Sequence, residues 1–458
     1  MNGDNLEDLV VTYGGYGMAQ QNLSKSLQIL INDGKNGFQK KEELSLSVGH
    51  ALSVVRGNDI DKDGDIDLFL GGSISQNKFP LTHSSYLLIN ELGTTPKLDK
   101  THLQSLGDLG IVMDALWTDT NNDGTIELMV ASHLKPIQIL SFQEEKLVNN
   151  LTINTTGFWN SIHPLDYDND GDMDYLVGNL GINTPLSNGE MPITITYKDQ
   201  DENGSIDVFT GFRFNQEKEI VPFEFRNEVI AQLPNLKKQF TDYQTFANST
   251  FDDFVKNTKQ TDLNKIVVEN FQHQLLQQKN GQLVPIPLPT TAQLSPIFGW
   301  TTSDFNQDNY TDVIASTNLS NSREFWGTYT ALDGLFLSNQ QDSTLFQTLP
   351  NAPLIKGDGR GIVSLVRNNQ IQHYISMVNA PVEMIQMDCD HCYQYQAKPN
   401  EQAALITFKD GSQQKVEFYY GNGFRSQGVR GFWVADVQEI EKIQVKTENR
   451  LIDLAFLK

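Results

Sequence analysis

Short apolar runs alternate with clusters of Asp, Asn and Gly along most of the chain. Runs such as Leu68–Leu70, Leu128–Val130 and Tyr175–Val177 are followed at once by small residues. Short apolar runs that end in turn residues are typical of buried β-strands, whereas a helix needs a longer stretch with apolar residues three or four positions apart. The pattern therefore predicts an all-β protein in which polar loops separate buried strands.

The polar clusters that precede these runs align without gaps in five copies. Each copy has an oxygen-bearing side chain at positions 1, 3, 5 and 9, and position 6 is Gly, or Asn in the last copy. Gly and Asn tolerate the positive φ of a tight turn. The ligand candidates at positions 1, 3, 5, 7 and 9 are Asp59, Asp61, Asp63, Asp65 and Asp67; Asp119, Asn121, Asp123, Thr125 and Glu127; Asp166, Asp168, Asp170, Asp172 and Asp174; Asp199, Asp201, Asn203, Ser205 and Asp207; and Asp304, Asn306, Asp308, Tyr310 and Asp312.

This spacing predicts calcium-binding loops. Ca²⁺ takes six to eight oxygen ligands, and side chains at positions 1, 3 and 5 converge on one point when the backbone curls. The carbonyl of position 7 adds a ligand, and the acid at position 9 closes the cage. A single such loop would be read as a solvated turn, but five copies in one register, each before a strand, favour metal. We expect about five structural Ca²⁺ ions, one for each copy.

An EF-hand is the alternative with a similar start, and the sequence argues against it. An EF-hand loop needs a Glu at position 12 and a helix on each side. Position 12 is Leu70, Val130, Val177, Thr210 and Ala315 in the five copies. The residues that follow favour strands rather than helices.

The N-terminus adds a partial copy, in which Asn2, Asp4 and Asp8 match positions 3, 5 and 9. Its first ligand would stand one residue before Met1, so we expect the chain to be a fragment that begins inside a calcium loop. Repeats about 60 residues apart, with a loop between strands, suit four-stranded propeller blades. We expect a β-propeller of about seven blades, the first one truncated, over residues 1–398.

Two regions depart from the repeat. Residues 226–264 have apolar residues at helical spacing, interrupted by Pro234, and predict a short helical insertion. Residues 399–458 lack the acidic loops and form, we expect, a small β-domain. Its first element is a hairpin over Ala403–Phe418 with an Asp410-Gly411 turn, and further strands follow.

The acidic loops resemble the FG-GAP/VCBS repeats of integrin-α-like β-propellers. The C-terminal region resembles the ASPIC/UnbV domain through Gly421–Gln427, which reads Gly-Asn-Gly-Phe-Arg-Ser-Gln. The whole arrangement is similar to a group of Bacteroidota cell-surface proteins. The resemblance implies an extracytoplasmic propeller at the outer-membrane surface, with a signal or lipid anchor upstream of the chain, sometimes beside a nutrient-uptake complex. It implies no defined ligand.

The composition of the chain argues against several classes of function. The chain has 458 residues and a formal net charge of −23, which argues against a nucleic-acid partner. No apolar run is long enough for a transmembrane segment. Cys389 and Cys392 form a lone Cys-x-x-Cys, for which a local disulfide or two unpaired thiols is favoured over a zinc or redox site.

The sequence contains no recognisable catalytic or cofactor-binding motif. It therefore favours a non-catalytic protein that binds a protein or glycan partner. The alternative is a polysaccharide lyase or hydrolase on the same scaffold, because a pair of catalytic carboxylates distant in sequence would leave no local motif.

Overall fold

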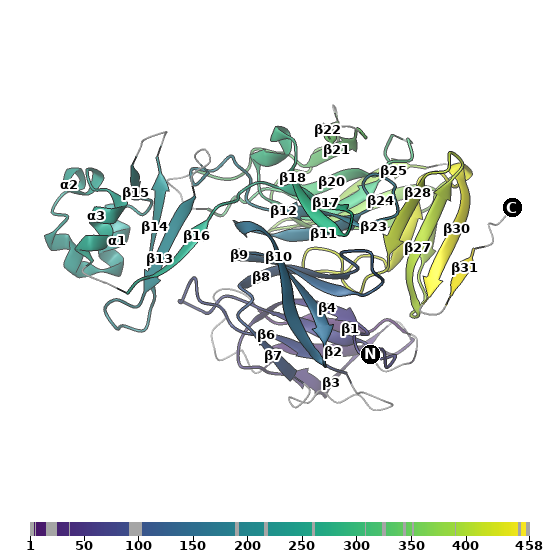
Figure 1. The fold of residues 1–458 in the computed structure, drawn as a ribbon, viewed down its shortest axis with the longest axis horizontal. Coiled ribbons are helices and arrows are strands. Elements are labelled where there is room, and N and C mark those ends of the chain that lie inside the picture. The colour runs from purple at the N-terminus through teal and green to yellow at the C-terminus, as the bar shows by residue number, and fades with distance from the viewer. Residues whose placement is uncertain are drawn as a thin grey trace.

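The computed structural model describes residues 4, 6–14, 25–35, 37–90, 103–187, 192–214, 219–258, 262–306, 308–322, 327–341, 345–349, 352–389, 391–447 and 450–454. Over these ranges the protein is built almost entirely from antiparallel strands, with three short α-helices (Figure 1). The predicted all-β class is confirmed. Within the same ranges, no helix is both long and apolar enough to cross a membrane.

Six antiparallel sheets form the main body, and their strands follow chain order except where noted below. The sheets are β1–β3 (Leu9–Thr12, Leu27–Asn32, Phe38–Leu46); β4–β7 (Leu52–Asn58, Asp67–Gly72, Ser85–Leu88, Leu103–Gly107); β8–β10 (Ile111–Thr118, Glu127–Gln143, Lys146–Phe158); β11, β12, β17 and β18 (Ser161–Leu165, Asp174–Gly178, Gln274–Lys279, Gln282–Pro287); β19–β22 (Ile297–Ser303, Asp312–Thr317, Leu335–Asn339, Phe346–Thr348); and β23–β25 (Gly359–Arg367, Gln370–Met377, Glu383–Asp388).

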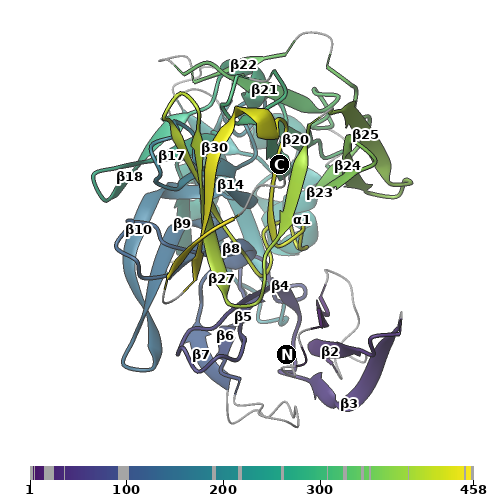
Figure 2. The same cartoon turned by 90° about the vertical axis from the view of Figure 1, so that its right-hand side faces the viewer.

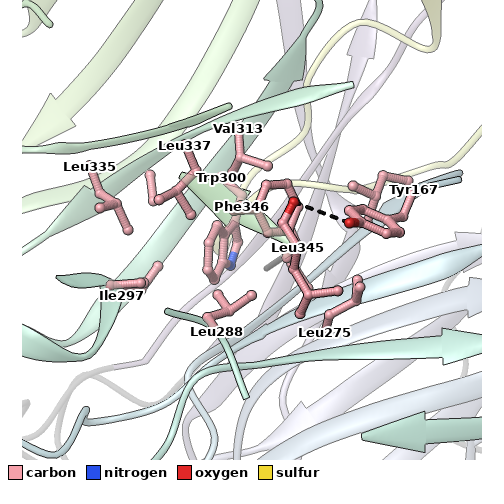
Figure 3. Close-up of a cluster of buried hydrophobic side chains, with 14 residues drawn as sticks. Tyr167, Leu275, Leu288, Ile297, Trp300, Val313, Leu335, Leu337, Leu345 and Phe346 are labelled. Carbon is pink, nitrogen blue, oxygen red and sulfur yellow. Dashed lines mark hydrogen bonds between the residues drawn. The ribbon is translucent and has the colours of Figure 1, made fainter. Parts of the chain in front are cut away.

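These sheets lie around a common axis in chain order (Figure 2). The first strand of a sheet contacts the first strand of the next, from β4 to β8, β11, β19 and β23 in turn. Apolar side chains fill the spaces between neighbouring sheets. Trp117, Trp159 and Trp300, which stand shortly before acidic loops, are all buried in these cores. Figure 3 shows the core between the fourth and fifth sheets, with Trp300 at its centre.

The fourth sheet is interrupted by a long excursion of the chain. Strand β12 pairs with β17, and the residues between them form a separate sheet of β13 (Ile193–Lys198), β14 (Asp207–Arg213), β15 (Ile220–Pro222) and β16 (Asn264–Val268). Three helices, α1 (Arg226–Gln232), α2 (Tyr243–Ala247) and α3 (Phe251–Asn257), pack on it. The helices fall inside the expected segment 226–264, but the excursion is longer and carries the Asp199 copy, far from the axis (Figure 1).

The C-terminal region forms two further sheets. One pairs β26 (Tyr393–Gln396) with β29 (Gly431–Val434), and the other contains β27 (Glu401–Phe408), β28 (Gln413–Glu417), β30 (Ile440–Thr447) and β31 (Leu451–Asp453). The predicted hairpin is β27–β28, and Gly411 in its turn has a φ of 90°. Strand β26 belongs to this region although it precedes the expected boundary at residue 399. Cys389 and Cys392, just before β26, are joined by a disulfide.

Residues 419–430, the axial loop, insert from the C-terminal region into the centre of the ring of sheets. The backbone N–H of Gly57 donates to the carbonyl of Tyr420 (3.0 Å), and the Arg56 guanidinium donates to the carbonyl of Gly423 (2.8 Å). The ring of Phe424 lies 5.5 Å from that of Phe298. The axial loop therefore contacts first strands of the second and fifth sheets and fills the axis between them.

Candidate metal centres

Each acidic loop joins two strands, and the acid at position 9 is the first residue of the second strand. Asp67, Glu127, Asp174, Asp207 and Asp312 begin β5, β9, β12, β14 and β20. One oxygen of each accepts the backbone N–H of position 2, at 2.9–3.0 Å. In three copies the other oxygen accepts an N–H from a residue at or near the end of the third strand of the sheet, at 2.7–2.8 Å. The loop ends are therefore fixed by the sheet itself.

Position 1 organises the turn. In every copy one of its carboxylate oxygens accepts the backbone N–H of position 6, at 2.9–3.0 Å. Position 6 has positive φ throughout, from 71° at Asn309 to 95° at Gly64, as the sequence predicted. Position 4 also has positive φ in four copies, at Lys62, Asn122, Asn169 and Glu202. The sequence did not reveal this second feature, because these side chains have no common chemistry.

Three of the five copies gather carboxylates from positions 1, 3 and 9. The groups are Asp59, Asp61 and Asp67; Asp166, Asp168 and Asp174; and Asp199, Asp201 and Asp207, and in each group the oxygens lie within 4.8 Å of one another. Oxygen donors at this spacing fit a hard divalent cation. Position 5, occupied by Asp63, Asp170 and Asn203, is outside these groups and accepts the N–H of position 7 at 2.7–2.9 Å.

The Asp119 and Asp304 copies lack a third carboxylate in such a group, within the part of the chain that the structure describes. Position 3 is an amide in both, and the Nδ2 of Asn121 and Asn306 donates to Asp123 and Asp308, each at 3.0 Å. Their position 7 residues, Thr125 and Tyr310, donate a backbone N–H to position 5 as elsewhere. These copies share the backbone geometry of the others but bring fewer charges together.

The partial N-terminal copy has the same hydrogen bonds where it is described. The N–H of Leu6 donates to Asp4 (2.9 Å), as position 7 donates to position 5 elsewhere. The N–H of Asn32, the last residue of β2, donates to Asp8 (2.9 Å), as a residue near the end of the third strand donates to position 9 in three complete copies. Asn2 lies outside the described residues. Asp4 and Asp8 thus occupy the places that the alignment predicted.

The Asp166 copy is the most deeply buried. Asp166 and Asp174 are 1% and 2% exposed. Burial raises the pKa of Asp166 to about 8 and that of Asp174 to about 7, and the neighbouring carboxylates add to both shifts. Among the described residues, no ion pair involves Asp166, Asp168 or Asp174. A cation in this loop would supply the positive charge that the protein does not.

Strand β28 covers this loop, a contact that the sequence did not predict. The backbone N–H of Lys415 donates to Asp166 Oδ2 (2.8 Å), and the N–H of Gln413 donates to the carbonyl of Asn169 (3.4 Å). Lys415 Nζ lies 3.2 Å from Glu417 Oε1, and Thr118 donates to Glu417 Oε2 (2.8 Å). The C-terminal region is therefore joined to the Asp166 loop through backbone hydrogen bonds.

Tyr167, at position 2 of the same copy, anchors the loop in the core. Its ring lies in the cluster of Figure 3, where its hydroxyl donates to the carbonyl of Leu345 (3.1 Å). Its own carbonyl accepts from Asn339 Nδ2 (2.8 Å). The Asp166 copy is thus held between the core below and β28 above.

Comparison with known families gives one match. The family model for an FG-GAP-like repeat matches residues 86–177, which include the Asp119 and Asp166 copies. The resemblance of this part of the chain to FG-GAP repeats is therefore confirmed. A search of curated proteins gave no match.

Proposed function

We propose that this protein is a calcium-stabilised β-propeller that binds a protein or glycan partner outside the cytoplasm and catalyses no reaction. The observation that carries the proposal is the recurrence of three-carboxylate groups in loops that each join the first and second strands of a sheet. FG-GAP repeats often bind calcium, and the family match covers two of the loops. The six sheets around one axis fit a propeller, with the C-terminal ASPIC/UnbV-like region docked on it.

The ions have a structural role in this proposal. In the Asp166 copy, Asp166, Asp168 and Asp174 would hold the cation. It would neutralise Asp166 and Asp174, which are buried, and Asp168, which is exposed. Extracellular calcium modules bind with dissociation constants of about 10⁻⁴–10⁻³ M, so the calcium level outside a cell would fill such sites. The Cys389–Cys392 disulfide also suits an oxidising compartment. Both features support a location at the outer-membrane surface, where the protein would be an accessory of an uptake complex.

Two observations support a binding role rather than an enzymatic one. The axis of the ring, where a propeller enzyme would hold its substrate, is filled by the axial loop. Asp114, a carboxylate on the wall of the axis, forms a buried ion pair with Arg56 and so is not poised as a general base. Most other grouped carboxylates belong to the metal loops.

The test is a screen of the full chain against immobilised glycans and against outer-membrane proteins, with calcium or with a chelator. The proposal predicts saturable binding to at least one class that is lost in the chelator, with no new reducing or unsaturated sugar ends. Glycan cleavage would contradict the non-catalytic role. Binding that persists unchanged in the chelator would contradict the dependence on calcium.

A further inference from the structure

The acidic loops of neighbouring sheets lie at one end of the ring. Ser53 of β4 donates its hydroxyl to the carbonyl of Val112 in β8 (2.6 Å). Three residues further along both strands, Arg56 Nε donates to the carbonyl of Ala115 (2.6 Å). The two first strands therefore run in the same direction. Because an acidic loop follows the last residue of each, both loops lie at the same end, here called the loop end.

The axial loop extends from the loop end to the opposite end of the ring. At its beginning, the Tyr419 hydroxyl donates to Glu417 Oε2 (3.0 Å), which also accepts from Thr118, the last residue of β8. Further along the loop, Arg425 Nη2 lies 3.5 Å from the sulfur of Met113, near the start of β8. The axial loop therefore follows the length of β8 and presents Arg425 at the end away from the acidic loops.

Phe424 and Arg425 form the tip of a tight turn in the axial loop. The backbone N–H groups of Gly423 and Ser426 each donate to the carbonyl of the other, at 3.2 and 3.1 Å. Arg425 has a φ of 49°, a left-handed conformation that is uncommon for any residue but glycine. Such conformations carry an energetic cost and are found most often at functional sites. Arg425 is also exposed, so a ligand can reach it.

A second guanidinium group lies at the same end of the ring. Arg360, the second residue of β23, lies over the ring of Phe298, 4.1 Å from its centroid. The Phe298 ring is 5.5 Å from the ring of Phe424, over which Arg425 lies at 5.3 Å. Two guanidinium groups therefore flank a pair of aromatic rings. Burial lowers the pKa of the Arg360 guanidinium, Asp358 opposes this shift, and the positive charge of Arg425 adds to it.

The positive charge of Arg425 has no carboxylate partner at this end. Arg56 forms its ion pair with Asp114, and Arg360 lies 3.9 Å from Asp358. Among the described residues, no ion pair includes Arg425. The chain as a whole has a net charge of −23, so an exposed guanidinium without a partner is not typical of its surface. An anionic group of a ligand would complete the pairing.

We propose that the tip of the axial loop binds a glycan through a carboxylate-bearing sugar, with Arg425 pairing with the carboxylate. A planar guanidinium matches a carboxylate through two parallel hydrogen bonds. The half-buried ring of Phe424 offers an apolar face against which a sugar ring can pack. One unpaired positive charge suits a single anionic sugar, whereas an extended acidic protein surface would be repelled by the strongly negative chain. This inference rests on the binding role of the proposed function and names the class of its ligand.

The experiment titrates the full chain in calcium, by calorimetry, with a disaccharide that ends in glucuronate and with the matched disaccharide that ends in glucose. The proposal predicts saturable binding of the acidic sugar only. Arg425→Gln should weaken this binding at least about tenfold, because it removes the charged fork, and Arg425→Lys should give an intermediate loss. Arg367→Gln is the matched control, because it removes an exposed guanidinium at the far end of β23, and it should bind like the unchanged chain.

Melting curves in calcium establish that each variant is folded, and the comparison of the two sugars on the unchanged chain needs no variant. Equal binding of both sugars, binding of neither, or full binding by folded Arg425→Gln would contradict the site. Tighter binding of a glutamate-rich peptide that is lost in Arg425→Gln would show that the ligand is an acidic protein segment and would contradict the glycan. A partner found in the calcium-dependent screen that Arg425→Gln still binds would leave the proposed function standing while this site fails.

Discussion

The Asp166 and Asp199 copies share one motif and one local geometry but differ in what surrounds them. Asp166 is buried beneath β28, and Tyr167 anchors its loop in the core. The Asp199 copy lies in the excursion, where Asp199 itself is half-buried and position 2 is the half-buried Gln200. Both bring three carboxylates together. We therefore propose that the motif determines where a cation can bind, whereas the structure that covers the loop determines how much the stability of the fold depends on that cation.

The physical cause is desolvation. A carboxylate at the surface keeps its charge in contact with water, but a buried one must be neutralised by a proton or a cation. The raised pKa values of Asp166 and Asp174 reflect the cost of desolvating their charged forms when no metal ion is bound. The pKa of Asp207 is also raised by burial, but less strongly. The predictions below test this contrast, from the largest expected effect to the smallest.

Replacing position 1 should separate the two copies most clearly. With calcium present, Asp166→Ala should lower the free energy of unfolding by about 3 kcal/mol, because it removes one partner of a buried charged group. Asp199→Ala should cost about 1 kcal/mol or less, because its loop is open to water. Urea denaturation of the two variants in calcium measures both values. Equal losses would contradict the role of burial.

Stability should depend on pH when calcium is removed. Since the pKa of Asp166 in the folded state is about 8 and that of Asp174 about 7, both above the usual value near 3.8, the folded state binds more protons in between. Stability is therefore greatest at low pH within this window and falls as the pH rises from about 4 to about 8.

The free energy of unfolding should fall by at least about 2 kcal/mol in chelator, because one unit of difference in pKa between the folded and unfolded states is worth about 1.4 kcal/mol. This fall should shrink in Asp166→Asn and persist in the matched variant Asp207→Asn. Denaturant unfolding at a series of pH values, with and without calcium, measures it. If the free energy of unfolding in chelator does not change over this pH range, burial of these carboxylates in their charged form does not destabilise the fold.

The hydrogen bond that β28 donates to Asp166 should contribute less to the free energy of unfolding than the Asp166 side chain does. Lys415→Pro removes the N–H that donates to Asp166, and Pro is tolerated at this position because β28 is an edge strand. A hydrogen bond to a charged group is worth about 1.5–3 kcal/mol, so a loss near the lower value is expected. Lys415→Ala keeps the N–H and serves as the control. Similar unfolding curves for the two variants would show that the hydrogen bond from β28 does not stabilise the Asp166 loop.

The features that could be predicted from the sequence are those determined by residues close to one another along the chain. The turn at position 6 and the hairpin at Asp410-Gly411 depend on residues close along the chain, and the structure has them where they were predicted. Three of the five acidic copies bring the carboxylates of positions 1, 3 and 9 together.

The parts that could not be predicted depend on long-range packing. The ligand positions of the Asp199 copy do not indicate that it lies in an excursion, because they match those of the other copies. Position 2 gives only a partial signal: it is Gln200 in this copy and Ile60, Tyr167 and Phe305 in three copies of the main body, but the polar Thr120 in the fourth. The contact of Lys415 with Asp166 and the path of the axial loop bring together segments far apart in sequence, which no local pattern encodes.

The most direct test of the account is the melting temperature of the full chain in about 1 mM CaCl₂, in the same concentration of MgCl₂, and in excess chelator. The account predicts a cooperative transition in calcium, a strongly lowered transition in chelator, and recovery when calcium but not magnesium is restored. An identical melting curve in calcium and in chelator would contradict the claim that the folded state is a calcium-bound state.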